Sequence, residues 1–109
     1  MRMAEVREIS ATALKAMLDR GDTFELIDVR SPAERDVAAI PGSKLLDQAV
    51  YDSLIRADPG ATLVFHCHHG ERSRQAAWHF IQLGFESIYN VSDGIDGWSR
   101  EVDPSVPRY

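Results

Sequence analysis

The segment that most limits how this chain can fold is a short, mainly apolar run that leads into a polar stretch with a cysteine. Residues 62–65 are rich in β-forming side chains, residues 66–74 read HCHHGERSR, and residues 75–83 have apolar side chains at helical spacing. This order predicts a buried strand that turns into a helix near Cys67. Because the first N–H groups of a helix have no intrahelical partner, they favour negative charge and lower the pKa of a nearby thiol.

Strand and helix patterns alternate along the chain. Strands are predicted at residues 5–9, 24–29, 44–46, 62–66 and 87–91. Helix signals run from Ser10 to Gly21, from the capping box Ser31-Pro32-Ala33-Glu34 onward, from Asp47 to Leu54 and over residues 75–83, and a turn or short helix near Gly94 and Gly97 presents Trp98. Such alternation predicts the α/β class, with a doubly wound, mainly parallel sheet flanked by helices on both faces.

Length and composition limit the organisation and the partners of the chain. With 109 residues, we expect a single domain over residues 1–109. One cysteine cannot form an internal disulfide, so we expect a reducing compartment, the cytoplasm. No apolar run approaches about 18 residues and no charged-then-apolar leader is present, so we expect no membrane span and no signal peptide. The net charge of -5 argues against nucleic-acid binding, although residues 66–74 are locally basic.

Three separated motifs point to one family. They are Leu26-Ile27-Asp28-Val29-Arg30 with Glu34 and Ile40-Pro41-Gly42; Cys67-His68-His69-Gly70-Glu71-Arg72-Ser73; and Asn90-Val91 with Gly94, Gly97 and Trp98. In this order, and over nearly the whole chain, they resemble the rhodanese (sulfurtransferase) homology domain. One departure is Ala38-Ala39, where many members carry Gly-His. We expect this departure to change a turn and not the chemistry.

The resemblance implies a doubly wound α/β fold and a cysteine that accepts a sulfane sulfur as a persulfide. It makes Cys67 the catalytic nucleophile. The substrate-binding loop around Cys67 then consists of His68, His69, Gly70, Glu71, Arg72 and Ser73. The implied partners are a small anionic sulfur donor such as thiosulfate, and cyanide, a thiol or a protein as sulfur acceptor. No cofactor and no metal are implied.

The residue types in the loop suit this chemistry. Attack on the outer sulfur of thiosulfate requires a thiolate and stabilisation of the leaving sulfite. Backbone N–H groups can cradle the anion, and Gly70 permits dihedral angles that a Cβ would oppose. Arg72 adds a permanent cation, while His68 and His69 add partial positive charge as the pH falls. Glu71 works against this charge, and we expect it to point to solvent.

Two other function classes share parts of this pattern. Phosphatases and arsenate reductases also place a cysteine after a histidine, but their arginine follows after five intervening residues, where this chain has Ser73. Arg72 and Arg74 follow Cys67 after four and six residues, so neither occupies that position. The third hypothesis is a non-catalytic interaction module that binds an anion or a partner through the loop. An unreactive thiol would favour this module, and aryl-phosphate turnover would favour a phosphatase.

Several conspicuous residues have structural explanations. Consecutive histidines cannot easily aim at one metal ion, so we expect His66 to pack inward or to hydrogen-bond locally, and His79 to lie on a helix surface. Arg30 is expected to pair with Glu34 or Asp28 and to fix the loop after its strand. Trp98 and Trp78 are expected to be core or rim aromatics.

Overall fold

The sheet is built as the alternation predicts. In residues 4–109, which the computed structural model describes, five strands form one sheet in the order β1-β5-β4-β2-β3, and the paired strands are parallel. The strands are β1 (Arg7–Ile9), β2 (Glu25–Asp28), β3 (Lys44–Leu45), β4 (Thr62–His66) and β5 (Ser87–Val91). The predicted α/β class is therefore confirmed. All five predicted strands are present: β4 and β5 have the predicted bounds, and β1, β2 and β3 are shorter than predicted.

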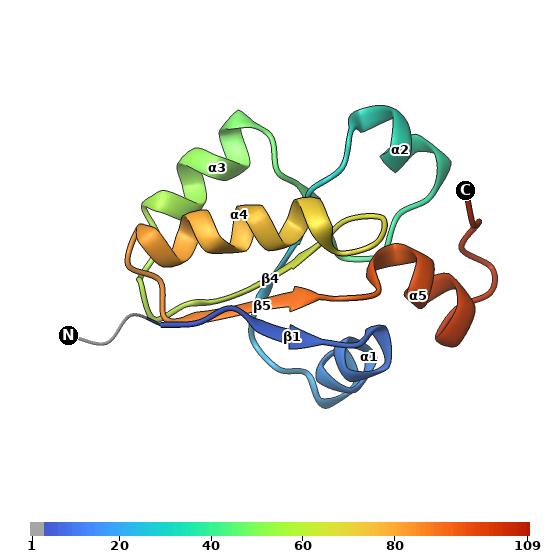
Figure 1. The fold of residues 1–109 in the computed structure, drawn as a ribbon. Helices are drawn as coiled ribbons and strands as arrows, with labels where there is room; N and C mark the ends of the chain where they lie inside the picture. Colours follow the sequence, from blue (N-terminus) through green and yellow to red (C-terminus); the bar gives the residue numbers. More distant parts are fainter. Residues whose placement is uncertain (1–3) are drawn as a thin grey trace.

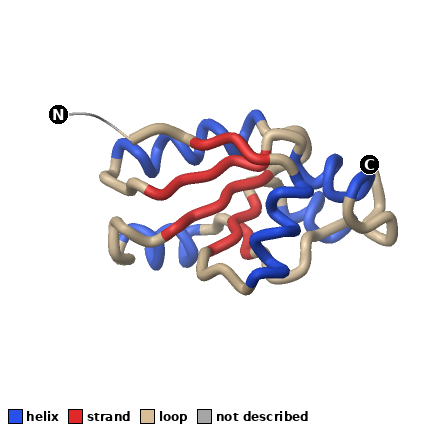
Figure 2. The backbone as a smooth tube through the Cα atoms, turned by 90° about the horizontal axis from the view of Figure 1, so that it is seen from below, coloured by secondary structure: helices blue, strands red, loops and turns tan. Residues whose placement is uncertain are grey.

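Helices cover both faces of the sheet (Figures 1 and 2). On one face lie α1 (Ala11–Arg20) and α5 (Gly94–Glu101), and on the other lie α3 (Gln48–Ile55) and α4 (Glu71–Gln82). The short α2 (Pro32–Val37) follows β2. Alternate side chains of β4 supply both cores: Val64 packs with α1 and α5, whereas Leu63 and Phe65 pack with α3 and α4. This burial on both faces explains why the strands read as apolar runs.

Local capping signals set the ends of three helices. The Ser10 side chain accepts a hydrogen bond from the backbone N–H of Ala13, and the Asp47 side chain accepts one from Val50. Ser31 and Glu34 form the predicted capping box at the start of α2. These contacts involve residues three positions apart, which is why the sequence pattern alone predicts them. No helix in residues 4–109 has both the length and the apolar composition needed to cross a membrane.

The carboxyl ends of the three inner strands meet at one edge of the sheet. β4 lies between β5 and β2, and the register pairs His66 with Asp28. The chain leaves β4 at Cys67 and curls back into α4, beside α2 and the C-terminal residues (Figure 1). In open parallel sheets, this edge is where ligands bind. Cys67 therefore lies where the fold favours a binding site.

Candidate active site

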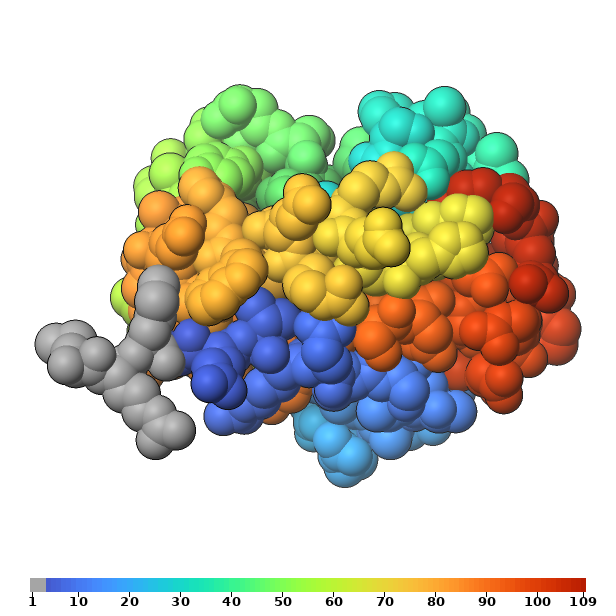
Figure 3. All heavy atoms as spheres, viewed as in Figure 1, coloured from blue at the N-terminus to red at the C-terminus, as the bar shows by residue number. Residues whose placement is uncertain are grey.

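Cys67 follows the central strand directly, and its side chain is enclosed. The residue is 1 % exposed. Its neighbour His66 is fixed in the sheet, because the His66 carbonyl accepts a 2.7 Å hydrogen bond from the N–H of Val29. In Figure 3, the segment after Cys67 (yellow) reaches the surface between α2 and the C-terminal residues. The rigid strand thus fixes the thiol just below an exposed turn.

Gly70 allows the chain to curl around the sulfur. Its φ angle is +99°, which is in the left-handed region, and a Cβ at this position would collide with the backbone carbonyl of Ser92. In this conformation the Gly70 N–H donates to Cys67 Sγ across 3.1 Å. The prediction that Gly70 adopts dihedral angles a Cβ would oppose is confirmed.

The helix after the loop begins four residues earlier than predicted. α4 starts at Glu71 and not at residue 75, so Arg72, Ser73 and Arg74 belong to its first turn and not to a loop. No side-chain cap marks this start, because its N-cap is Gly70. The segment between β4 and α4 is therefore shorter than the predicted bounds imply, and it brings the free N–H groups of the helix close to the sulfur.

The N-terminus of α5 holds the other side of the turn. The N–H of Ile95 donates to the Cys67 carbonyl across 2.9 Å, and the N–H of Asp96 donates to the His68 carbonyl across 3.2 Å. A Cβ on Gly94, which has φ of +59°, would collide with these carbonyls. Because α5 holds the carbonyl groups, the N–H groups of the turn remain available to face the sulfur.

A buried amide organises the polar contacts around the sulfur. Asn90 Nδ2 donates to the Gly70 carbonyl across 3.0 Å and to Glu8 Oε1 across 2.9 Å. Both partners can only accept, so Asn90 Oδ1 must face Ser73, whose Oγ lies 2.5 Å away. Ser73 Oγ also lies 3.3 Å from Cys67 Sγ. Asn90 and Glu8 thus support the site although sequence reasoning gave them no role in it.

Hydrogen bonds to the sulfur lower the pKa of Cys67. Burial alone would raise the pKa of this thiol, but the Ser73 hydroxyl and the backbone N–H groups of Ser73, Gly70 and His69 favour the thiolate, and together they outweigh burial. The net direction is below the ordinary value, as expected for a cysteine at the start of a helix.

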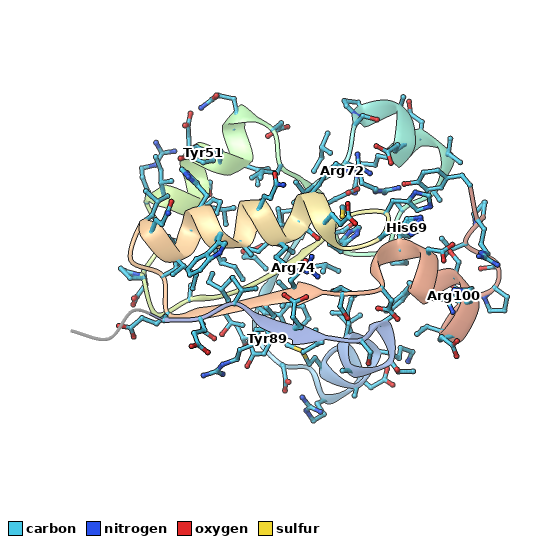
Figure 4. The ribbon with its side chains drawn as sticks, viewed as in Figure 1. Tyr51, His69, Arg72, Arg74, Tyr89 and Arg100 are labelled. Atoms are coloured by element: carbon cyan, nitrogen blue, oxygen red, sulfur yellow. The ribbon has the colours of Figure 1, made fainter. Side chains whose placement is uncertain are left out.

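Arg72 and Arg74, which are labelled in Figure 4, lie in the first turn of α4. Both are paired with carboxylates. Arg72 donates to the two oxygens of Glu34 across 2.6 and 2.9 Å, and Arg74 donates to the two oxygens of Glu8 across 2.9 and 3.1 Å. From the sequence, Arg72 was expected to add a permanent cation beside the thiol, and no partner was predicted for it. The fold instead brings α2 close enough for Glu34, the capping residue, to bind it.

The two histidines of the turn lie in a stack of three rings. The ring centroids of His68 and His69 are 3.9 Å apart, and Tyr109 stacks on His68 at 4.0 Å with an interplanar angle of 11°. Desolvation and the neighbouring His69 lower the pKa of His68, so this imidazole carries less positive charge at neutral pH than we expected. Glu71 is exposed, as predicted.

Asp28 and Arg30 form the predicted structural pair. Arg30 donates to both oxygens of Asp28, each across 2.8 Å, and also to the Ala38 carbonyl across 2.7 Å. Arg35 adds a third hydrogen bond to Asp28 at 3.0 Å. These contacts fix the segment after β2. His66 is fully buried, as predicted, and neither ring nitrogen has a hydrogen-bond partner among the described residues.

The fold and the site together define a class of protein. The protein is an α/β domain with a parallel sheet. A cysteine suited to act as a nucleophile lies between the central strand and a helix N-terminus, at the edge of the sheet where ligands bind. The family model of the rhodanese-like domain matches residues 10–101. The chain therefore belongs to the rhodanese-like family.

Individual relatives agree with this membership. The chain is 39% identical over 87 residues to the thiosulfate sulfurtransferase GlpE of Pseudomonas aeruginosa, covering 79% of this chain and 78% of that protein. It is 37% identical over 93 residues to the rhodanese-like/PpiC domain-containing protein 12 of Arabidopsis thaliana, but it spans only 31% of that longer protein. The human single-domain sulfurtransferase TSTD1 has the same fold, with a TM-score of 0.73 at 24% identity, over 89% of this chain and 98% of that one. These findings support a sulfurtransferase in general.

Proposed function

We propose that this protein moves a sulfane sulfur from thiosulfate, or a similar small anionic donor, to a thiol or cyanide acceptor through a persulfide on Cys67. The observation that carries this proposal is the set of hydrogen bonds at the sulfur. Gly70 N–H and Ser73 Oγ lie 3.1 and 3.3 Å from Cys67 Sγ, and the pKa of the thiol is lowered. A stabilised thiolate is the form that attacks sulfur.

In the first half-reaction, the Cys67 thiolate attacks the outer sulfur of thiosulfate. A bond forms between Sγ and that sulfur, and the bond between the two thiosulfate sulfurs breaks. Sulfite leaves with the electron pair, so the enzyme gains one sulfur atom. During this step, negative charge moves from the thiolate to the leaving sulfite. The N–H groups at the start of α4 can stabilise this charge.

In the second half-reaction, a nucleophilic acceptor attacks the outer sulfur of the Cys67 persulfide. The bond between that sulfur and Sγ breaks, and the electron pair returns to Sγ as a thiolate. Cyanide would leave as thiocyanate, and a thiol acceptor would leave as a persulfide. The hydrogen bonds from Gly70 and Ser73 stabilise the thiolate that is released, which supports the return step as well as the attack.

The setting of the arginines favours sulfur transfer over phosphate chemistry. A phosphatase needs an arginine that is free to bind the phosphoryl oxygens in the transition state. Arg72 and Arg74 are each held by both oxygens of a carboxylate.

A single free thiol also fits a reducing compartment, and we propose that the protein acts in the cytoplasm.

Intact mass spectrometry tests the proposal. Incubation with thiosulfate should add one sulfur atom to the protein, cyanide should remove it, and Cys67→Ala should abolish the gain. Full activity in Cys67→Ala would contradict the mechanism. Turnover of an aryl phosphate at a rate comparable to sulfur transfer would instead identify a phosphatase, and a thiol that stays unmodified would identify a binding module.

A further inference from the structure

The charge of the Cys67 thiolate acts on Arg72, whose guanidinium is already bound by a third group, Glu34. Hydrogen bonds from Arg72 to Glu34 raise the pKa of the guanidinium, and the charge of Cys67 raises it further. Arg72 is about half exposed, at 49 %, whereas Glu34 is 21 % exposed. An anion that arrives at Cys67 therefore has to share this guanidinium with Glu34 or displace it.

Glu34 is fixed on both of its oxygens. On one side, Oε1 accepts hydrogen bonds from the N–H and the hydroxyl of Ser31, at 3.1 and 3.2 Å, in addition to the one from Arg72. On the other side, Oε2 accepts a hydrogen bond from the Tyr109 hydroxyl at 2.7 Å in addition to the second one from Arg72. A carboxylate with this many donors stays ionised and in place.

Tyr109 is itself oriented by the buried Arg30. Arg30 Nη1 donates to the Tyr109 hydroxyl across 3.0 Å. Because arginine can only donate, the one proton of the Tyr109 hydroxyl is directed to Glu34. The Tyr109 ring stacks on His68 at the same time. Contacts therefore run from the end of β2 through Arg30, Tyr109 and Glu34 to Arg72.

We propose that Glu34, held in place by Tyr109, is a specificity-determining residue that competes with an anionic sulfur donor for Arg72. This inference rests on the proposed sulfur transfer. A dianion such as thiosulfate has to share the guanidinium with Glu34 or displace that carboxylate. A donor with less negative charge gains less from the guanidinium, so Glu34 opposes it less. The pair of Glu34 and Tyr109 thus sets how strongly the site discriminates between donors by charge.

An alkyl persulfide, which carries at most one negative charge against the two of thiosulfate, is the matched comparison donor. The Cys67 thiolate attacks its outer sulfur, a bond forms between Sγ and that sulfur, and the S–S bond of the donor breaks. An alkyl thiolate leaves with the electron pair, and the charge or proton of the outer sulfur stays on the transferred sulfur. The product on the enzyme is the same Cys67 persulfide as with thiosulfate, so intact mass spectrometry can follow both donors.

The decisive variant is Glu34→Gln. Glutamine has nearly the same shape and also serves in a capping box, so α2 keeps its start while the competing charge is removed. We expect the thiosulfate concentration that gives half-maximal loading of Cys67 to fall about two- to fivefold, the range that an exposed ion pair corresponds to. The value for the alkyl persulfide should fall clearly less, because this donor carries less negative charge. Tyr109→Phe keeps the ring on His68 and should shift the thiosulfate value in the same direction by less.

Two controls isolate the competition. Asp22→Asn removes the same charge from the exposed pair with Arg20 at the far end of α1, and it should leave both donors unaffected. In an Arg72→Ala background, Glu34→Gln should no longer change the thiosulfate value. A rise in that value for Glu34→Gln, no change, or an equal shift for both donors would overturn the inference. If the wild-type protein gains no sulfur from either donor, the proposed function itself fails, and the inference fails with it.

Discussion

Asn90 Oδ1 and Ser73 Oγ, 2.5 Å apart, form a hydrogen bond whose direction the surroundings determine. Asn90 Nδ2 faces two acceptors, so Asn90 Oδ1 faces Ser73 and accepts the hydroxyl proton whenever Ser73 does not give it to Cys67 Sγ. The Ser73 hydroxyl has one proton, which it cannot give fully to Asn90 and to Cys67 Sγ at once. When Cys67 is a thiol, Ser73 Oγ can accept from it; when Cys67 is a thiolate, the proton can turn toward the sulfur. The Ser73 hydroxyl can thus reorient as Cys67 gains or loses its negative charge.

Two substitutions of Asn90 should distinguish the hydrogen bonds that its amide donates from the shape of its side chain. In Asn90→Asp a carboxylate would face the Gly70 carbonyl and the Glu8 carboxylate, and we expect a loss of about 3 kcal/mol or more in the free energy of unfolding. Asn90→Ala leaves the Gly70 carbonyl without its partner and should cost about 1–3 kcal/mol. Urea unfolding measures both. Equal stability of Asn90→Asp and the wild type would show that the amide orientation is wrong.

Ser73→Ala should make Cys67 less reactive. Without the hydroxyl, the thiol keeps the backbone N–H groups but loses a side-chain donor, so its pKa rises and the thiolate is less populated. We expect alkylation of Cys67 at pH 7 to slow by roughly fivefold, equivalent to a hydrogen bond of about 1 kcal/mol. Ser53→Ala, on the exposed side of α3, is the matched control and should react at the wild-type rate. An unchanged pH profile of alkylation in Ser73→Ala would contradict the assignment.

Alanine substitutions at Gly70 and Gly84 can be compared to test the close packing of the turn after Cys67. Both have nearly the same φ, +99° and +103°, but a Cβ at Gly84 would meet nothing within 4 Å, whereas one at Gly70 would collide with Ser92. Gly84→Ala should therefore cost only the backbone strain, about 1–2 kcal/mol. Gly70→Ala should cost clearly more in thermal or urea unfolding, and it should lose sulfur loading. Similar losses in the two variants would mean that the Ser92 contact relaxes freely.

Acidification should destabilise the protein through His66. Burial lowers the pKa of this imidazole to about 4 in the folded state, against an ordinary value of 6.5. Below pH 6.5 the unfolded chain binds a proton that the folded protein does not, so stability falls as the pH drops from 6.5 to 4, by up to about 3 kcal/mol.

Two measurements check this dependence on pH. In an NMR titration, the His66 ring should keep its neutral signals down to about pH 4. Urea unfolding between pH 6.5 and 4 should show the loss of stability. If His66 titrates near 6.5 and stability is flat across this range, the imidazole is not held neutral by burial.

Local patterns were sufficient to predict most of the fold. The strands are apolar because both faces of the sheet are covered, and the caps Ser10, Ser31 and Asp47 act within one turn of their own helix. The early start of α4 was not predictable in the same way. Its first turn has no side-chain cap, and its charged residues read as a loop until the conformation of Gly70 is known.

The support of the site depends on contacts between distant parts of the chain. Glu8 and Asn90 are 82 residues apart, and Glu34 and Tyr109 are 75 apart. No local pattern reports such pairs. For Asn90 the sequence offered a signal besides its place in the third motif: it is a polar residue in a buried strand, near the carboxyl end, where a side chain has to find a partner. For Tyr109, in the irregular tail, the sequence offered no comparable signal.

The hydrogen bonds from α5 to the turn after Cys67 determine when this turn can fold during synthesis. The carbonyl groups of Cys67 and His68 are bound by residues 95 and 96, and the Asp93 side chain in turn accepts a hydrogen bond from the N–H of Ala11. A nascent chain that has only emerged from the ribosome as far as α4 lacks these partners. The reactive turn therefore acquires its shape only after α5 has been synthesised, so the thiol matures late in biosynthesis.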